Sequence, residues 1–218
     1  MASDTTSDAA VATRSNSDLV FALCHELGNL LAGARLEAGL LDPGGGAAEL
    51  AKAGERISEL SARAGSLLAL VRPLLAPEAI AVLPADPLEV LDGLRRGLDE
   101  SCDLRVAIEL KSAAQLPGAE LAPELVHHLL LTAIFCGLEA GGSEGRVRVR
   151  AEAAGERVVF LVEDAGRMSS ADAAPQLRGR PLTHAISRAL LAEQGGGFEA
   201  TRSGDCTRVA FTFPVAAR

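Results

Sequence analysis

The 218-residue chain has no Trp and no Tyr, and its six Phe residues bring the aromatic content to only 3%. Ala and Leu must therefore supply most of the packing, which favours helices. Basic runs are also missing: Lys and Arg are spread along a chain whose formal net charge is -8. A nucleic-acid binder needs a basic surface, and anionic membranes attract polybasic segments. We therefore expect no nucleic acid and no membrane among the partners.

Cysteines are few and far apart. They are Cys24, Cys102, Cys136 and Cys206. No two of them have the close spacing of a zinc-binding pair, and a disulfide framework is not expected at this density. We interpret them as small, buried or half-buried thiols.

A long apolar run and a signal peptide are also absent from the sequence. No stretch of about 18 apolar residues is present, which predicts no membrane span. Residues 1–17 are rich in Ser, Thr, Asp and Ala and lack a basic start followed by an apolar run. We therefore expect a disordered tail and a cytoplasmic protein.

A histidine lies within an apolar repeat of helical period at residues 18–41. The repeat steps by three and four through Val20, Leu23, Leu27, Leu30, Ala34 and Leu41. These residues line one seam of a predicted helix. His25 then falls on the outer face, with Asn29 one turn further along the same side and Glu26 directly after it. An exposed imidazole beside an acid indicates a nucleophile or a proton carrier.

A second and cleaner repeat follows a stop rich in Pro and Gly at residues 42–46. Its apolar positions are Leu50, Ala53, Ile57, Leu60, Ala64, Leu67, Val71 and Leu74. Two heptad helices across a tight loop predict a helical hairpin over residues 18–76. Because a hairpin cannot bury both flanks of its seam alone, we expect a homodimer with a four-helix bundle. The alternative is that the hairpin packs on the rest of its own chain.

The remainder of the chain changes pattern after a proline-rich stretch, which predicts a linker at residues 77–85. The predicted helices span residues 87–100, 121–140 and 181–194, and the predicted strands span 104–110, 146–150, 157–163, 198–202 and 207–213. Helices on one face of a mixed sheet make an α+β layer domain over residues 86–218. The arginines at 146, 148 and 150 fit an anion site or, more usually, a solvated sheet face.

The order of a helical hairpin, the motif His25-Glu26-x-x-Asn29 and an α/β domain resembles the core of a two-component sensor histidine kinase. The resemblance covers about residues 18–214, and residues 25–32 are similar to the phosphoacceptor box of that family. It implies that residues 86–218 form the ATPase-like α/β sandwich of these kinases.

The first ATP-binding box of that family is altered in this sequence. The resemblance implies asparagines, one of them a magnesium ligand, where this chain has Thr132 and Cys136. A thiol is a poor ligand for the hard magnesium ion.

The two glycine-rich boxes of that family are also degenerate. The second survives only as Asp164 and Gly166, because Met168 replaces its second glycine. The third offers Gly179 followed by Pro181, which has no N–H for a phosphate. Three losses together argue that ATP is not used.

A kinase-like chain that keeps its histidine and loses its ATP boxes resembles the ChpT-type histidine phosphotransferases. These are dimers that relay phosphoryl groups between receiver domains, and their degenerate ATPase-like domain helps to dock partners. The resemblance implies a phosphotransferase of a two-component phosphorelay whose partners are response-regulator receiver domains. No cofactor is implied, because the receiver brings the magnesium.

In this reading His25 is the phosphoryl acceptor, since a neutral imidazole is nucleophilic near pH 7. It attacks the acyl phosphate of a receiver aspartate in line. Glu26 is expected to contact the other ring nitrogen and to hold the tautomer. For Asn29 the resemblance implies a further role, the positioning of water for dephosphorylation of the receiver.

The receiver is expected to dock between His25 and the hairpin loop. The outer residues there are Ala32, Gly33, Leu36 and Leu40, where small residues beside leucines let a partner helix approach. The other histidines, His127, His128 and His184, are interpreted as structural.

Three alternatives remain open from the sequence. The first is a receiver phosphatase that uses Asn29. The second is a weak but true histidine kinase with unusual ATP contacts. The third is a non-catalytic dimeric scaffold that sequesters a response regulator.

Overall fold

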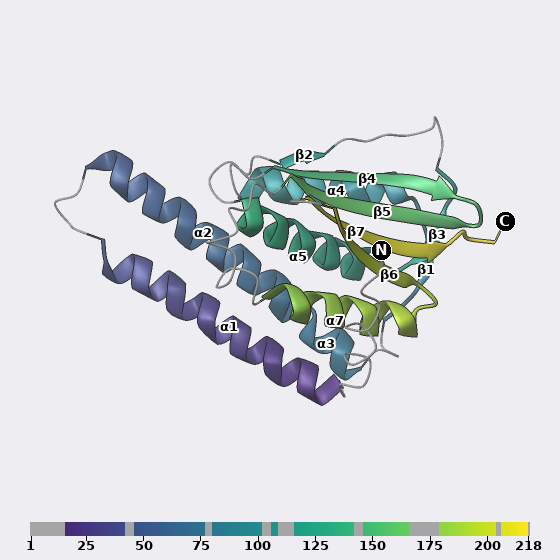
Figure 1. Cartoon of the computed structure of the whole chain (residues 1–218), viewed down its shortest axis with the longest axis horizontal. Coiled ribbons are helices and arrows are strands. Elements are labelled where there is room, and N and C mark those ends of the chain that lie inside the picture. The colour runs from purple at the N-terminus through teal and green to yellow at the C-terminus, as the bar shows by residue number, and fades with distance from the viewer. Residues whose placement is uncertain are drawn as a thin grey trace.

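The structure, a computed structural model, describes residues 16–41, 46–76, 80–101, 106–108, 116–141, 146–165, 179–203 and 206–217. Helices α1 (Asn16–Gly39) and α2 (Ala47–Ala69) form the predicted hairpin, which extends from a layer of helices and strands (Figure 1). Most of the predicted tail, and residues 77–79 of the predicted linker, lie outside the described residues.

The second hairpin helix ends earlier than the heptad pattern predicts. The heptad continues to Leu74 and predicts one helix that includes it, but α2 stops at Ala69 and a short helix α3 (Val71–Leu75) follows. Pro73 explains the break, because its ring has no N–H to donate and clashes with the carbonyl four residues back, that of Ala69. The N–H of Leu70 bonds instead to the oxygen of Leu67 at 3.1 Å.

The rest of the described chain is a layer of helices packed on a mixed sheet. Its strands lie in the order β2 (Val106–Ile108), β4 (Val147–Ala154), β5 (Arg157–Ala165), β7 (Cys206–Pro214) and β6 (Gly197–Ser203). The helices are α4 (Pro87–Ser101), α5 (Pro123–Gly141) and α7 (Gly179–Glu193). Only β2 pairs in parallel, with β4, among the described strands. The predicted α+β class is confirmed.

Two short strands were not predicted. β1 (Leu83–Ala85) lies within the segment predicted to be a linker, and β3 (Ala119–Leu121) replaces the predicted start of a helix. They pair antiparallel, with Leu83 opposite Leu121. Each has three residues, which is too short for an alternating pattern to be read from sequence.

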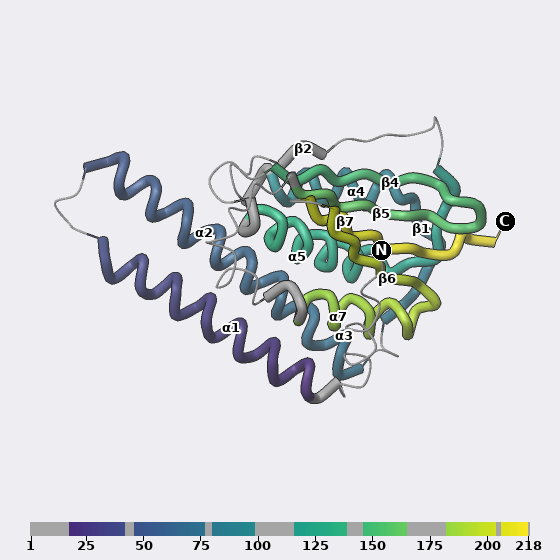
Figure 2. Tube along the Cα trace, viewed as in Figure 1, coloured from purple at the N-terminus to yellow at the C-terminus, as the bar shows by residue number. Residues whose placement is uncertain are grey.

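The base of the hairpin and the sheet domain share one hydrophobic core. Leu23, Leu70 and Leu74 of the hairpin segment are at most 1% exposed and belong to the same buried cluster as Leu129 and Ile186 of the domain. The trace in Figure 2 shows the hairpin running past α5 and α7. The predicted division into a hairpin, a linker and a domain stays a prediction, because the hydrophobic core continues across the predicted boundary.

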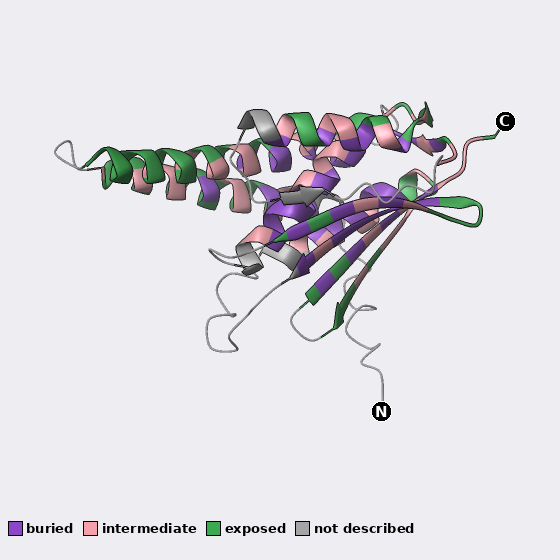
Figure 3. Cartoon of the chain, turned by 90° about the horizontal axis from the view of Figure 1, so that it is seen from above, coloured by how far each residue is buried: buried purple, intermediate pink, exposed green. Residues whose placement is uncertain are grey.

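The end of the hairpin near the α1–α2 connection is mainly exposed (Figure 3). The sequence predicted no stretch able to span a membrane, but residues 18–39 of α1, with a mean hydropathy of 1.2, are long and apolar enough by length and composition. That helix carries Glu26 and Glu37, which form ion pairs with Arg63 and Arg56 of α2. These pairs favour its role as one half of the hairpin.

Candidate functional site

His25 lies exposed on α1 and is contacted by the side chain one turn further along. The Nδ2 atom of Asn29 is 3.1 Å from Nδ1 of His25. Residues four apart on a helix are neighbours, which is why these two side chains meet. Depending on how its amide is turned, Asn29 donates to an unprotonated Nδ1 or accepts from Nδ1–H. In the second case Nε2 carries a free lone pair.

Glu26 is placed differently from the sequence-based expectation. Its carboxylate is 3.5 Å from the guanidinium of Arg63 on α2, and both side chains are largely shielded from solvent. Consecutive side chains on a helix are about 100° apart, so Glu26 turns toward the seam while His25 turns outward. The ring contact expected of Glu26 is made by Asn29.

Exposed side chains continue the line of His25 along α1 toward the hairpin loop. Ala32, Leu36 and Leu40 follow Asn29 at steps of three and four and are exposed, Leu36 at 63% and Leu40 at 70%. We call His25, Asn29, Ala32, Leu36 and Leu40 the α1 outer face. These residues therefore form one continuous helix surface.

Two differences from the predicted surface stand out. Gly33 is half-buried, and a Cβ placed on it lies 3.6 Å from Leu60 of α2, so this glycine belongs to the contact between the hairpin helices. Phe21 was missed, although it is 76% exposed and lies one turn before His25. The signal was available, since a phenylalanine four residues before the histidine shares its face.

The described residues leave little space where the resemblance places a nucleotide. The Sγ atom of Cys136 lies 3.6 Å from Oγ1 of Thr183, joining α5 to α7, and both residues are buried. The hydroxyl of Thr132 donates to the oxygen of His128 in its own helix at 2.7 Å. Neither side chain therefore offers a carbonyl or carboxylate oxygen as a magnesium ligand.

The remaining space in this region is too small for a purine. The cavity lined by Cys136, Asp164, Thr183 and Phe198 has a volume of about 10 Å³, roughly that needed for one water molecule. Oδ1 of Asp164 accepts the N–H of Thr207 at 2.7 Å. Residues 166–178, which include Met168, lie outside the described residues, and Gly179 and Pro181 begin α7. The described residues do not fit ATP.

The fold packs α5 tightly against the sheet at this point. A Cβ added to Gly137 would lie 2.8 Å from Cγ2 of Val147 and 3.2 Å from Cβ of Asp164. Only a glycine allows this approach of helix and strand. Among the described residues, no group of three or more His, Cys, Asp or Glu side chains is placed to hold a metal ion.

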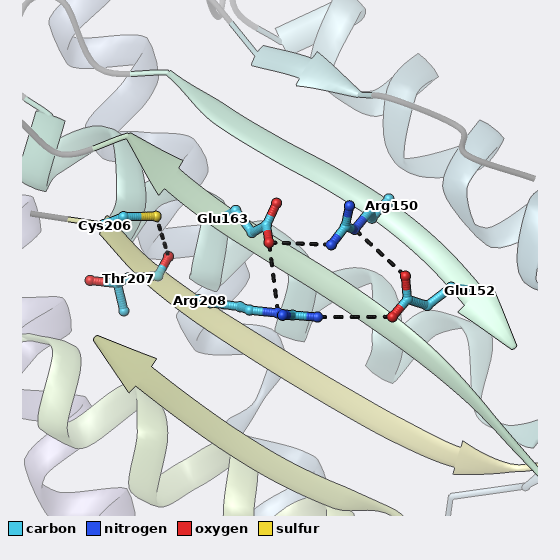
Figure 4. A network of polar contacts seen from close by, with 6 residues as sticks. All are labelled: Arg150, Glu152, Glu163, Cys206, Thr207 and Arg208. Carbon is cyan, nitrogen blue, oxygen red and sulfur yellow. Dashed lines mark hydrogen bonds and ion pairs between the residues drawn. The ribbon is translucent and has the colours of Figure 1, made fainter. Parts of the chain in front are cut away.

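Arg150, one residue of the predicted arginine row, is part of a network of two arginines and two glutamates on the outer face of the sheet (Figure 4). Arg150 lies 3.3 Å from Glu163 and 3.8 Å from Glu152, and Arg208 lies 3.7 Å and 3.9 Å from the same two carboxylates. Leu161 pairs with Arg150 in the ladder and so shares its face of the sheet, and it is only 1% exposed. The two carboxylate partners of Arg150 argue against an anion site there. Its side chain is only 18% exposed, so it does not match a freely solvated face either.

The cysteines only partly match the expectation of buried or half-buried thiols. Cys136 is buried, but Cys24 and Cys206 are exposed, and Cys102 lies outside the described residues. Burial of the sulfur raises the pKa of the Cys206 thiol, with smaller contributions from Asp164 and Glu163. The thiolate of Cys206 is therefore disfavoured.

The other three histidines pack against rings. The rings of His127 and His128 meet edge to face at 5.5 Å, and the ring of His184 lies 5.2 Å from that of Phe198. Burial lowers the pKa of His127, with a smaller contribution from His128. Burial also lowers the pKa of His128, while Glu124 acts weakly in the opposite direction.

Comparison with known proteins places the fold. No protein-family model matches the chain. No curated protein matches it either. Solved histidine kinases are similar to it. The kinase AdeS of Acinetobacter baumannii has a TM-score of 0.54 and 14% identity over 89% of this chain and 96% of its own.

Two further kinases agree with this result. ThkA, solved in complex with the response regulator TrrA, has a TM-score of 0.55 and 14% identity over 91% of this chain and 61% of its own. Full-length ShkA, solved in complex with AMPPNP, has a TM-score of 0.53 and 21% identity over 93% of this chain and 46% of its own.

These similarities define the fold class of the chain. The chain has the fold of a histidine kinase core, a helical hairpin followed by an ATPase-like α/β domain.

Proposed function

We propose that this protein is a histidine phosphotransferase of the ChpT type, which relays a phosphoryl group between receiver-domain aspartates through His25. The observation that carries the proposal is the combination of an exposed His25 on a kinase-like hairpin with a nucleotide region closed to about 10 Å³. Its partners are response-regulator receivers, as one of the similar kinases is bound to a response regulator.

The transfer requires little of this chain beyond a positioned nucleophile. Nε2 of His25 attacks the phosphorus of the receiver's aspartyl phosphate in line, and a new N–P bond forms as the P–O bond to the aspartate breaks. The electron pair of the broken bond stays on the leaving carboxylate. In this step Nδ1 keeps its proton. The amide of Asn29, whose Nδ2 atom lies 3.1 Å from Nδ1, must therefore be turned so that its Oδ1 accepts that proton. A second receiver reverses these steps, and each receiver supplies its own magnesium.

ATP has no role in this proposal. The contact between Cys136 and Thr183 occupies the space between α5 and α7, and Asp164 is already bonded to the backbone of Thr207. The chain would therefore accept phosphoryl groups only from another protein. The weak-kinase alternative requires this region to open.

We also propose that the protein is a cytoplasmic homodimer. Of the large apolar side chains described as exposed, all but Leu83 lie on the hairpin segment. Leu31 is two residues from Asn29 and so lies on another side of α1, where it is 59% exposed; Leu68 of α2 is 60% exposed. A second copy that covers these leucines would give the four-helix bundle.

The dimer is tested by light scattering on the full chain. We expect the mass of two chains for the wild type and of one chain for Leu31→Lys combined with Leu68→Lys. Leu83→Lys is the matched control, because Leu83 is also exposed, at 56%, but lies off the hairpin. A wild type with the mass of one chain would refute the dimer.

The transfer is tested with a panel of receiver domains charged with labelled phosphate. The label should move to the wild type and to the control variant Arg35→Ala, an exposed change on the same helix, but not to His25→Gln. Labelling by ATP alone would favour the kinase. Free phosphate with no label trapped on the chain would favour the phosphatase. Binding of a receiver without any transfer, equal in His25→Gln, would favour the scaffold.

A further inference from the structure

A second surface, independent of His25, is a groove along the N-terminal turns of α4 and α5. Its volume is about 1020 Å³, and its walls come from residues 85–96 and 123–128. We call it the α4–α5 groove. Small-ligand pockets hold about 300–1,000 Å³ and enclose most of their ligand, so a groove of this volume, lying along two helices, suits a segment of protein better than a metabolite.

Acidic side chains dominate the lining of this groove. The charged residues are Asp86, Glu89, Asp92, Glu124, Arg95 and Arg96. Arg95 is occupied by Asp92, with 2.9 Å between Nη2 and Oδ1. The carboxylates of Glu89 and Glu124 lie in the first turns of their helices, where they already complement the helix dipoles. Counting all of these side chains, four carboxylates against two guanidinium groups leave the lining with a formal charge of −2, so a cation is a better occupant than a phosphate.

The floor of the groove is uncharged at neutral pH. It contains Val90, His127 and His128. Burial holds the pKa of both histidines below the ordinary value. Within the described chain, Nδ1 of His128 has no hydrogen-bond partner, and a buried unpaired nitrogen also disfavours the protonated ring. The floor therefore offers aromatic and aliphatic surface between acidic walls.

Gly93 lines the groove, and the chain's own packing does not require a glycine at this position. A glycine inside a helix costs about 1 kcal/mol relative to alanine. A Cβ added to Gly93 would meet no atom within 4 Å, in contrast to Gly97, whose Cβ would lie 3.4 Å from the ring of His127. A larger side chain at Gly93 would project into open space lined by the groove.

We propose that the α4–α5 groove docks a short basic segment of a partner protein. Lys or Arg side chains of that segment meet Glu89 and Glu124, and one of its apolar side chains covers Val90 and His127. Charge complementarity selects this occupant, as in other helix-lined grooves that hold amphipathic segments. The surface does not depend on phosphotransfer by His25 and gives the ATPase-like domain a docking role of its own.

The test uses the full chain and a fluorescein-labelled amphipathic peptide of Lys and Leu, with a Glu and Leu peptide as the opposite-charge probe. We expect only the Lys peptide to bind, and Gly93→Trp to weaken it about tenfold or more. Gly54→Trp is the matched control, since that helix glycine of α2 also has no atom within 4 Å of an added Cβ. Its affinity should equal that of the wild type.

Two charge-reversal variants keep the test decisive if Gly93→Trp fails to fold. Glu89→Lys should weaken the Lys peptide, whereas Glu193→Lys, an equal charge change at the exposed end of α7, should have no effect. Equal affinities for Gly93→Trp and the wild type would overturn the proposal. So would equal losses in both charge variants, preference for the Glu peptide, or displacement of the Lys peptide by inorganic phosphate.

Discussion

Asn29 is proposed to hold the tautomer of His25, and its removal gives a graded effect. Asn29→Ala deletes one neutral side-chain hydrogen bond, of 3.1 Å, on an exposed surface. Such bonds contribute about 0.5–1.5 kcal/mol net, and about 1.36 kcal/mol corresponds to a tenfold change in rate. We therefore expect phosphoryl transfer from a receiver to His25 to slow about two- to tenfold. Folding stability should change little, because both side chains are exposed.

The assay measures single-turnover transfer from a labelled receiver together with the ¹⁵N shifts of the His25 ring, which distinguish its tautomers. In the wild type we expect mainly the form protonated at Nδ1, and in Asn29→Ala a mixture. Arg35→Ala, on another side of α1, controls for general changes in the helix. A ring whose tautomers and transfer rate are the same in Asn29→Ala would refute the reasoning. A loss of a thousandfold or more would show that Asn29 does more than position the ring.

Three further predictions concern docking, packing and pH. If the α1 outer face docks the receiver, Leu36→Asp should slow phosphoryl transfer from the cognate receiver about tenfold or more. The midpoint of its unfolding in urea should stay unchanged. An unchanged transfer rate for every receiver would rule out this docking surface. Gly137→Ala should lower the free energy of unfolding by about 1–3 kcal/mol, because the added methyl group overpacks α5 against β4. Gly93→Ala should instead raise the free energy of unfolding by up to about 1 kcal/mol. Urea titration tests both variants, and a Gly137→Ala variant more stable than the wild type would contradict the close packing. Because burial lowers the pKa of His127 and His128 below 6.5, the unfolded chain takes up protons first as the pH falls below about 6.5, so stability falls there. Replacing both His127 and His128 by Gln should make the loss of folding stability between pH 7 and pH 5 less steep. An equally steep loss of stability in the double variant would refute the histidines as its cause.

The sequence predicted those parts of the fold that follow from regular patterns. The heptads predicted both hairpin helices, alternation predicted β4, and a continuous apolar run predicted β5 as a more buried strand. The break after Ala69 was missed because the heptad continues through it, although Pro73 removes the hydrogen bond on which the helix depends. β1 and β3 are stabilised by pairing with each other, and such a long-range contact leaves no local pattern.

The candidate site was predicted to a similar degree. The repeat placed His25 outward, but adjacency in sequence suggested Glu26 as the partner of its ring. On a helix, the neighbour is the residue four positions away, and Arg63 of α2 attracts Glu26 instead. Closure of the nucleotide region depends on Cys136 and Thr183, which are 47 residues apart, so the degenerate boxes indicated a loss of ligands and could not indicate a filled cavity.

The core that runs without interruption from Leu23 through Leu70 to Ile186 has a consequence for how the molecule melts. In the described chain these residues belong to one buried apolar cluster, so neither part can lose its packing without exposing apolar surface on the other. Within that shared region, heat should therefore produce a single cooperative transition. The outer half of the hairpin contributes little to this core and should fray first, at the same end of the molecule where a partner is expected to bind.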